Sequence, residues 1–414
     1  MGRSTLYLII LAVIITVAVL LASLQPWAPG SRSSGQPFQN VLATPTSISQ
    51  TSPHPSMLTS RYGDIVVYIR MPESPVSLNG GGSTFVYPQM QAWISRFRNI
   101  SESLVSINYQ GIGSGAGEAQ WFSRVLDFGA ADVPISNSTY SKLASAGAGF
   151  IQFPIIAGSV VIIYNLPGWD GSVCGSLRLS GEVLASIYLG SIIYWDDPRV
   201  RDLQVDICRS KLPHEPIRAI HRSDGSGTTA LFTLYLSHVS SEWSRRVGYG
   251  YTVEWPRDAL GYGEGARGND GVAAKVKGTA YSIGYVEYSY AVANKLSFAA
   301  LKNRDGYFVL PSPQSVSEAL RRGAQDLPEP SQYWGDVPRS FIDKEGRDTY
   351  PIVGLVYVFI YTDLPRDKAI ALSAFFRWIL TEGQRQDNLV EGYLPLPTEL
   401  AKQAIGYIEK ALKY

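Results

Sequence analysis

The 414-residue sequence is poor in the residues that build metal and redox centres. It has two cysteines, Cys174 and Cys208, and four histidines that include no HExxH pair. A metal cluster needs more ligands at closer spacing, so we expect neither a metal nor another cofactor. The cysteines lie 34 positions apart, which leaves two alternatives open: one disulfide in an exported chain, or two separate buried thiols.

Charged residues are also scarce, at 17% of the chain, and the formal net charge is only +1. Domains that bind nucleic acid usually carry a strongly basic surface, so we expect no nucleic-acid partner. No G-x-x-x-x-G-K-[ST] phosphate loop occurs. The stretch 263–268 fits G-x-G-x-x-G but follows no clear strand, so we do not predict a dinucleotide site.

A single long hydrophobic run is present, Leu6–Ala22, preceded by Arg3. It is short for a membrane span and long for the apolar core of a signal peptide. Residues 1–25 are therefore interpreted as an anchor or a signal segment, and an uncleaved anchor is favoured. Residues 26–60 are rich in Ser, Thr and Pro and predict a flexible stalk. Either alternative places the rest of the chain outside the cytoplasm.

The remaining sequence alternates short β-type runs with amphipathic helical patterns. We predict strands at 64–69, 105–110, 159–165, 280–286 and 352–361, and helices at 87–100, 230–247 and 367–384. This alternation is typical of an α/β protein whose sheet is covered on both faces. Asn99 and Asn137 begin triplets of the N-glycosylation type, whose use depends on the host.

Three segments share one pattern: small, rich in Gly with Ser or Thr, and followed at once by a helix. They are Gly80–Phe85, Gly111–Gly117 and Asp224–Thr229. The first N–H groups of a helix lack internal partners and carry partial positive charge, so such a terminus binds anions. One such loop is usually an ordinary helix cap, whereas three in one chain indicate an oxyanion site.

Two further groups sharpen this hypothesis. The planar guanidinium of Arg222 suits bidentate contact with a tetrahedral oxyanion, and Asp224 could hold it in place. Asp132 lies among small residues in the stretch DFGAADVPIS. Taken alone, Arg222 and Asp132 are more typical of surface ion pairs than of ligands.

The chain resembles the phosphate-specific substrate-binding proteins of ABC transporters, in order from about Asn79 almost to the C-terminus. The resemblance is carried by GGSTFVYPQMQAW, INYQGIGSGAG, DFGAADVPIS, QFPIIAGSVVIIYNLPG, IYLGSIIYWDDP, HRSDGSGTTALFTLYL, EWP, GNDGVAAKV, SIGYVEYSYA and GYLPLP. It departs from the common pattern at His221, where many members have a second basic residue, and at Ala131, where a Ser is common.

The resemblance implies a two-lobed α/β fold of the periplasmic-binding-protein type II, or Venus-flytrap, class with a hinge between the lobes. Lobe one would comprise residues 77–155 and 306–414, and lobe two residues 156–305. The implied phosphate ligands are Thr84, Phe85, Ser114, Asp132, Arg222, Ser226, Gly227 and Thr228, with Asp224 in support. Asp132 would accept the proton that phosphate keeps near neutral pH and that sulfate lacks, whereas arsenate would resemble phosphate.

The implied function is binding of inorganic phosphate outside the cell and its delivery to the permease and ATPase subunits of an ABC importer. The chain would be a monomer held at the extracellular face of the plasma membrane, or secreted if the N-terminal segment is cleaved, and would not be an enzyme. Two alternatives remain open. One is an anchored phosphohydrolase, which would need an activating base or metal that the sequence does not display. The other is a phosphate sensor or scavenger without an importer.

Overall fold

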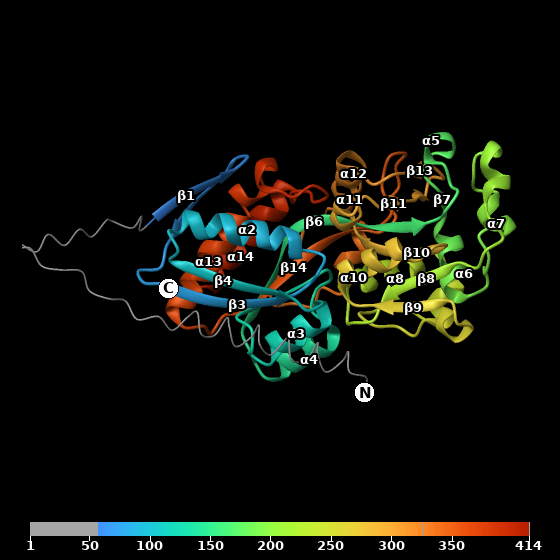
Figure 1. Cartoon of the computed structure of the whole chain (residues 1–414). Coiled ribbons are helices and arrows are strands. Elements are labelled where there is room, and N and C mark those ends of the chain that lie inside the picture. Colours follow the sequence, from blue (N-terminus) through green and yellow to red (C-terminus); the bar gives the residue numbers. More distant parts are fainter. Residues whose placement is uncertain (1–56, 325, 414) are drawn as a thin grey trace, which may run out of the picture. The chain divides into compact units, whose positions relative to one another are not determined.

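The computed structural model describes residues 57–324 and 326–413, which Figure 1 draws as coloured ribbons. They belong to one compact unit, Pro53–Tyr414. The expected anchor or signal segment lies outside the described residues, as does the stalk apart from its last four positions, which belong to the first strand. Within the described part, no helix has both the length and the apolarity needed to span a bilayer.

The elements are named as in Figure 1. The strands are β1 (Met57–Tyr62), β2 (Ile65–Arg70), β3 (Val76–Gly82), β4 (Val105–Gly111), β5 (Phe128–Ala131), β6 (Phe150–Asn165), β7 (Arg178–Leu179), β8 (Arg218–Arg222), β9 (Gly263–Ala266), β10 (Ser282–Glu287), β11 (Ser297–Phe298), β12 (Ala300–Lys302), β13 (Phe308–Val309) and β14 (Val353–Tyr361). The α-helices are α2 (Tyr87–Ile100), α3 (Ser114–Phe122), α4 (Asn137–Ser145), α5 (Gly171–Cys174), α6 (Gly181–Leu189), α7 (Pro198–Arg201), α8 (Gly227–Val239), α9 (Ser241–Arg246), α10 (Gly268–Gly278), α11 (Tyr288–Ala293), α12 (Pro313–Gly323), α13 (Arg366–Ile379) and α14 (Thr398–Ala411). Short 3-10 turns are η1 (Asp206–Lys211), η2 (Pro256–Leu260), η3 (Val337–Phe341), η4 (Glu382–Gln384) and η5 (Gln386–Asn388).

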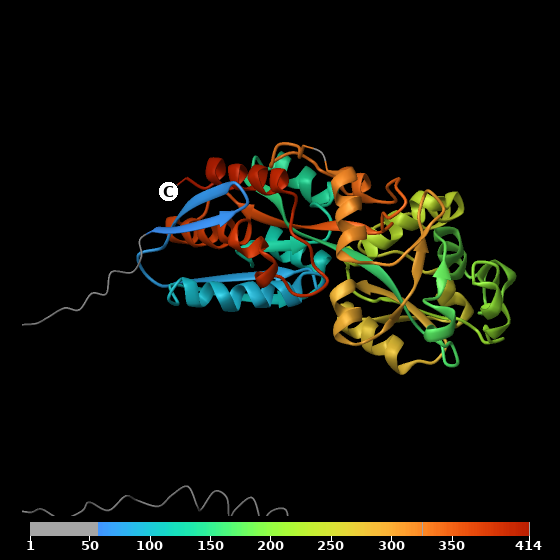
Figure 2. The same ribbon diagram turned by 90° about the horizontal axis from the view of Figure 1, so that it is seen from above.

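The main sheet has the order β4-β3-β5-β14-β6-β10-β8-β9, with β11 also paired to β6. Strand β6 changes partner along its length: Phe150–Ser159 pairs with β14, whereas Val160–Asn165 pairs with β10. It thereby joins two groups of strands, and Figure 2 shows it (green) passing from one to the other. We call the group around β3, β4, β5 and β14 lobe one, and the group around β8, β9 and β10 lobe two.

Strand β6 is longer than the sequence pattern predicts, because the prediction covers only residues 159–165. Its burial is continuous through Tyr164, as expected for a strand covered on both faces. Pro154 interrupts the β pattern, but its missing N–H is tolerated because the pairing with β14 shifts at Val356/Tyr357, opposite Pro154. The other predicted strands are present as β2, β4, β10 and β14.

Helix α2 covers the predicted range and buries Met90, Trp93 and Phe97 on one face. The prediction of a single helix at 230–247 is wrong, because α8 ends at Val239 and α9 begins at Ser241. The Ser240 hydroxyl accepts a hydrogen bond from the Trp243 N–H and so caps a new helix. Helix α13 fills most of the third predicted range. Figure 1 shows helices above and below the strands, so the α/β class is confirmed.

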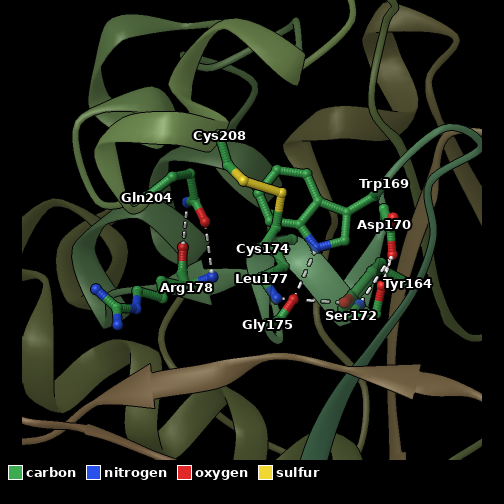
Figure 3. Close-up of a disulfide and its surroundings, with 10 residues drawn as sticks. All are labelled: Tyr164, Trp169, Asp170, Ser172, Cys174, Gly175, Leu177, Arg178, Gln204 and Cys208. Carbon is green, nitrogen blue, oxygen red and sulfur yellow. Dashed lines mark hydrogen bonds between the residues drawn. A yellow bond between two sulfur atoms is a disulfide. The ribbon is translucent and has the colours of Figure 1, made fainter.

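The two cysteines form a disulfide, drawn in Figure 3, which resolves the alternative left open by the sequence. It joins the end of α5 to η1, with the Cα atoms 5.8 Å apart. Beside it the Gln204 side chain exchanges two hydrogen bonds with the Arg178 backbone, at 3.0 and 2.8 Å. In a chain-entropy estimate, closing a loop of this length stabilises the fold by about 3–4 kcal/mol.

Candidate oxyanion-binding site

The three predicted loops approach one another at the junction of the lobes. Gly115 N–H, in the first turn of α3, donates to Gly225 O at 3.0 Å, joining the second loop to the third. The first loop connects through Thr84, whose hydroxyl accepts hydrogen bonds from Asn269 in lobe two. The sequence pattern alone indicates three anion-binding helix termini, and the fold brings those of α2, α3 and α8 together.

Asp132 lies at the centre of this arrangement, directly after β5, and is 1% exposed. Its Oδ2 accepts a hydrogen bond from Thr228 Oγ1 at 2.9 Å, and its Oδ1 accepts one from the Ser83 hydroxyl. Burial raises the pKa of Asp132 to about 6, while these hydroxyls and the charge of Arg222 oppose that rise. The carboxylate is therefore ionised above pH 6 and holds a buried negative charge beside hydroxyl donors.

Arg222 ends β8 and is the cation of the site. Its buried side chain donates from Nε to Asp224 Oδ1 at 2.7 Å and from Nη2 to Asp224 Oδ2. Burial would raise the pKa of Asp224, but the paired Arg222 guanidinium holds it below its usual value. Gly268 N–H also donates to Asp224 Oδ1 at 3.0 Å. Asp224 thus fixes the plane of the guanidinium while the remaining nitrogen donors stay available.

Two serines of the site have unused donor capacity. Ser114 begins α3, and its buried hydroxyl lies close enough to Asp132 to lower the pKa of that carboxylate, although it makes no hydrogen bond of regular geometry within the described residues. Ser226 caps α8 by accepting a hydrogen bond from the Thr229 N–H at 3.0 Å, so its hydroxyl proton is free to donate. A buried hydroxyl without a regular hydrogen bond is uncommon, and it points to a missing acceptor such as an anion.

Gly227 and Phe85 contribute backbone rather than side-chain chemistry. A Cβ placed on Gly227 would lie 2.5 Å from Ser114 Oγ and 2.7 Å from Asp132 Cγ, so only glycine fits between these residues. The Phe85 ring is buried, and the Phe85 carbonyl oxygen accepts a hydrogen bond from the Tyr393 hydroxyl at 2.5 Å. This bond holds the Phe85 backbone immediately before Val86, the N-cap residue of α2.

Sequence reasoning missed several residues that bond to predicted ligands, and two of them, Ser83 and Asn269, bond to the side chains of those ligands. Ser83 stands inside the first loop, next to Thr84, and donates to Asp132. Asn269 stands in the stretch GNDGVAAKV, beside the G-x-G-x-x-G match. As expected, no strand leads into that match: η2 ends at Leu260, the match itself forms β9 at Gly263–Ala266, and α10 begins at Gly268. Its role here is to start a fourth loop–helix unit at the site.

The likeness of the chain to known proteins is extensive. A model of the PBP superfamily domain matches residues 70–382. The phosphate-binding protein PstS of Methanocaldococcus jannaschii is 40% identical over 334 residues, which cover 80% of this chain and 85% of that protein. PstS of Pasteurella multocida is 37% identical over 330 residues, or 79% of this chain and 88% of that protein.

A solved structure supports the same fold. A human phosphate-binding apolipoprotein superposes with a TM-score of 0.61 at 18% identity, covering 79% of this chain and 93% of that one. Together with the superfamily match, this likeness confirms the expected two-lobed α/β fold.

Proposed function

The chain belongs to the PstS phosphate-binding proteins of the PBP superfamily, and from this premise we propose that it binds inorganic phosphate and delivers it to an ABC importer. The proposed ligands are the Thr84 and Ser114 hydroxyls, the Phe85 N–H, the Asp132 carboxylate, the Arg222 guanidinium and the start of α8 at Ser226, Gly227 and Thr228. The observation that carries the proposal is a buried carboxylate enclosed by hydroxyl donors and next to a buried arginine.

Asp132 is the proposed selector between phosphate and sulfate. Near pH 7 phosphate retains at least one proton, and the ionised carboxylate accepts it as a hydrogen bond. Sulfate has no proton, so its lone pairs would face a buried charge that nothing compensates. A buried charge left unpaired in this way costs several kcal/mol, which is enough to exclude sulfate.

Closure of the two lobes around the anion is the proposed binding motion. Ligand groups come from both lobes, with Asp132 in lobe one and Arg222 in lobe two, so a bound anion would favour the closed form. The chain would cross between lobes near residues 155 and 306, where the resemblance to the family implies the boundaries. We further propose that the monomeric protein works outside the cell, tethered or released by its N-terminal segment, and docks on the permease of the importer.

Titration calorimetry of the full chain with phosphate, sulfate and arsenate tests the proposal. We expect phosphate to bind, sulfate to bind far more weakly and arsenate to compete with phosphate. Release of phosphate from a phosphoester by the same preparation would instead support the alternative of an anchored phosphohydrolase. Absence of phosphate binding would contradict the proposal.

A further inference from the structure

Asn269 is the second residue of α10 and is completely buried. It follows Gly268, whose φ of +73° turns the chain from β9 into the helix. Asn269 is not among the phosphate ligands proposed above. Nevertheless its side chain lies between the hydroxyls of two of them, Thr84 and Thr228.

The orientation of the Asn269 amide is fixed by its surroundings. The Glu287 backbone N–H donates to Asn269 Oδ1 at 3.0 Å, and a backbone N–H can only donate. The Nδ2 end therefore faces the hydroxyls, and it donates to Thr84 Oγ1 at 3.1 Å and to Thr228 Oγ1 at 3.2 Å. The reversed amide would set two donors against each other at Glu287.

These bonds determine which way each hydroxyl can donate. Thr84 Oγ1 accepts from Asn269 Nδ2 and also from the Asn269 backbone N–H at 3.3 Å, so both of its lone pairs are engaged. Its remaining capacity is its proton. Thr228 Oγ1 accepts from Nδ2 and donates to Asp132 Oδ2 at 2.9 Å. Each hydroxyl is thus held as a donor directed away from Asn269.

We propose that Asn269 is a positioning residue that holds the Thr84 hydroxyl as a donor toward the bound anion and the Thr228 hydroxyl as a donor to Asp132, the carboxylate beside that anion. The inference rests on the proposed function, because the anion that receives the Thr84 proton is phosphate. Asn269 and Thr228 belong to lobe two and Thr84 to lobe one, so the same amide also links the lobes when they close. Asn269 acts through the two hydroxyls and need not contact phosphate itself.

A double-mutant cycle with Asn269→Ala and Thr84→Val tests this role by phosphate calorimetry on the full chain. Two orienting hydrogen bonds are lost in Asn269→Ala, so we expect phosphate affinity to fall about 10- to 100-fold. On the Thr84→Val background, where Thr228 keeps the only hydroxyl that Asn269 orients, the same change should weaken binding by a clearly smaller factor. Asn269→Asp keeps the side-chain shape but accepts hydroxyl protons and adds negative charge, so its loss should exceed that of Asn269→Ala.

Asn303→Ala is the matched control, because Asn303 is also a buried asparagine, and its amide bonds to the backbone at Gly346, Arg347 and Thr349 instead. It should lower the melting temperature and leave phosphate affinity unchanged. Wild-type affinity in both Asn269 variants, or equal losses on the two Thr84 backgrounds, would overturn the inference while leaving the proposed function intact. A wild-type chain that does not bind phosphate would overturn both. If Asn269→Ala does not fold, the neutral Asn269→Leu, which has a similar volume and no amide, completes the cycle in its place.

Discussion

A single methyl group added at Gly227 should hinder closure of the two lobes. The added Cβ of Gly227→Ala would lie 2.5 Å from Ser114 Oγ and 2.7 Å from Asp132 Cγ, both in lobe one, whereas Gly227 begins α8 in lobe two. Contacts this short force the neighbours apart, and such overpacking costs about 1–3 kcal/mol. Because the clash arises only when the lobes meet, the cost falls on the closed form. Phosphate affinity should therefore drop about 5- to 150-fold.

Calorimetry with phosphate measures this loss, and thermal unfolding without phosphate separates it from general destabilisation. The open form has room for the methyl group, so the ligand-free melting temperature should stay close to that of the wild type. Gly406→Ala in α14 is the control, because a Cβ there meets nothing within 4 Å. If Gly227→Ala bound phosphate as tightly as the wild type, the closed arrangement of Gly227 against Asp132 would be incorrect.

Three further predictions concern stability and closure. Burial raises the pKa of Glu287 from 4.5 to about 8, so Glu287 should contribute about 5 kcal/mol of stability at pH 4.5 that is lost as the pH rises to 8. Denaturant titrations should show a loss over this pH range that is smaller by about that amount in Glu287→Gln than in the wild type, and equal losses would contradict the raised pKa. Tyr251→Phe removes the hydroxyl that donates to Glu118 Oε2 at 2.8 Å between the two lobes. Because this hydrogen bond favours the closed form, its loss should weaken phosphate binding about 2- to 10-fold, and unchanged affinity would show that the bond does not contribute to closure. Replacing Cys174 and Cys208 with serine removes the disulfide and should lower the free energy of unfolding by about 3–4 kcal/mol while leaving phosphate affinity unaltered. A loss of affinity would show instead that the disulfide supports the site.

The sequence predicts the elements whose periodicity is uninterrupted. Helix α2 is predicted to the residue because Met90, Trp93 and Phe97 repeat at helical spacing. The sequence does not predict the first half of β6, because a proline such as Pro154 usually interrupts a strand. The bulge that accommodates Pro154 depends on pairing with β14, which follows some 200 residues later in the chain. The break at Ser240 is missed because a serine inside an apolar helical pattern gives no sign that its hydroxyl will cap a second helix.

For the site, the loops are recognisable from the sequence, but their meeting point is not. Gly, Ser and Thr before a helix fit an ordinary cap as well as an anion-binding terminus, and only the fold shows that Gly115 meets Gly225. Asn269 and Ser83 carry no independent signal, because their importance lies in the partners that their donors reach. The pKa of Asp132 likewise depends on burial that no local pattern reveals.

The most direct measurement is a comparison of phosphate and sulfate binding by the wild type and by Asp132→Asn at pH 7.5. At this pH the Asp132 carboxylate is ionised, because its pKa is about 6. The wild type should bind phosphate and discriminate strongly against sulfate. Asp132→Asn offers an amide that can donate to either anion, so sulfate should gain affinity, phosphate should lose it, and the preference should shrink by at least tenfold. A variant that keeps the full preference for phosphate would contradict the role assigned to Asp132.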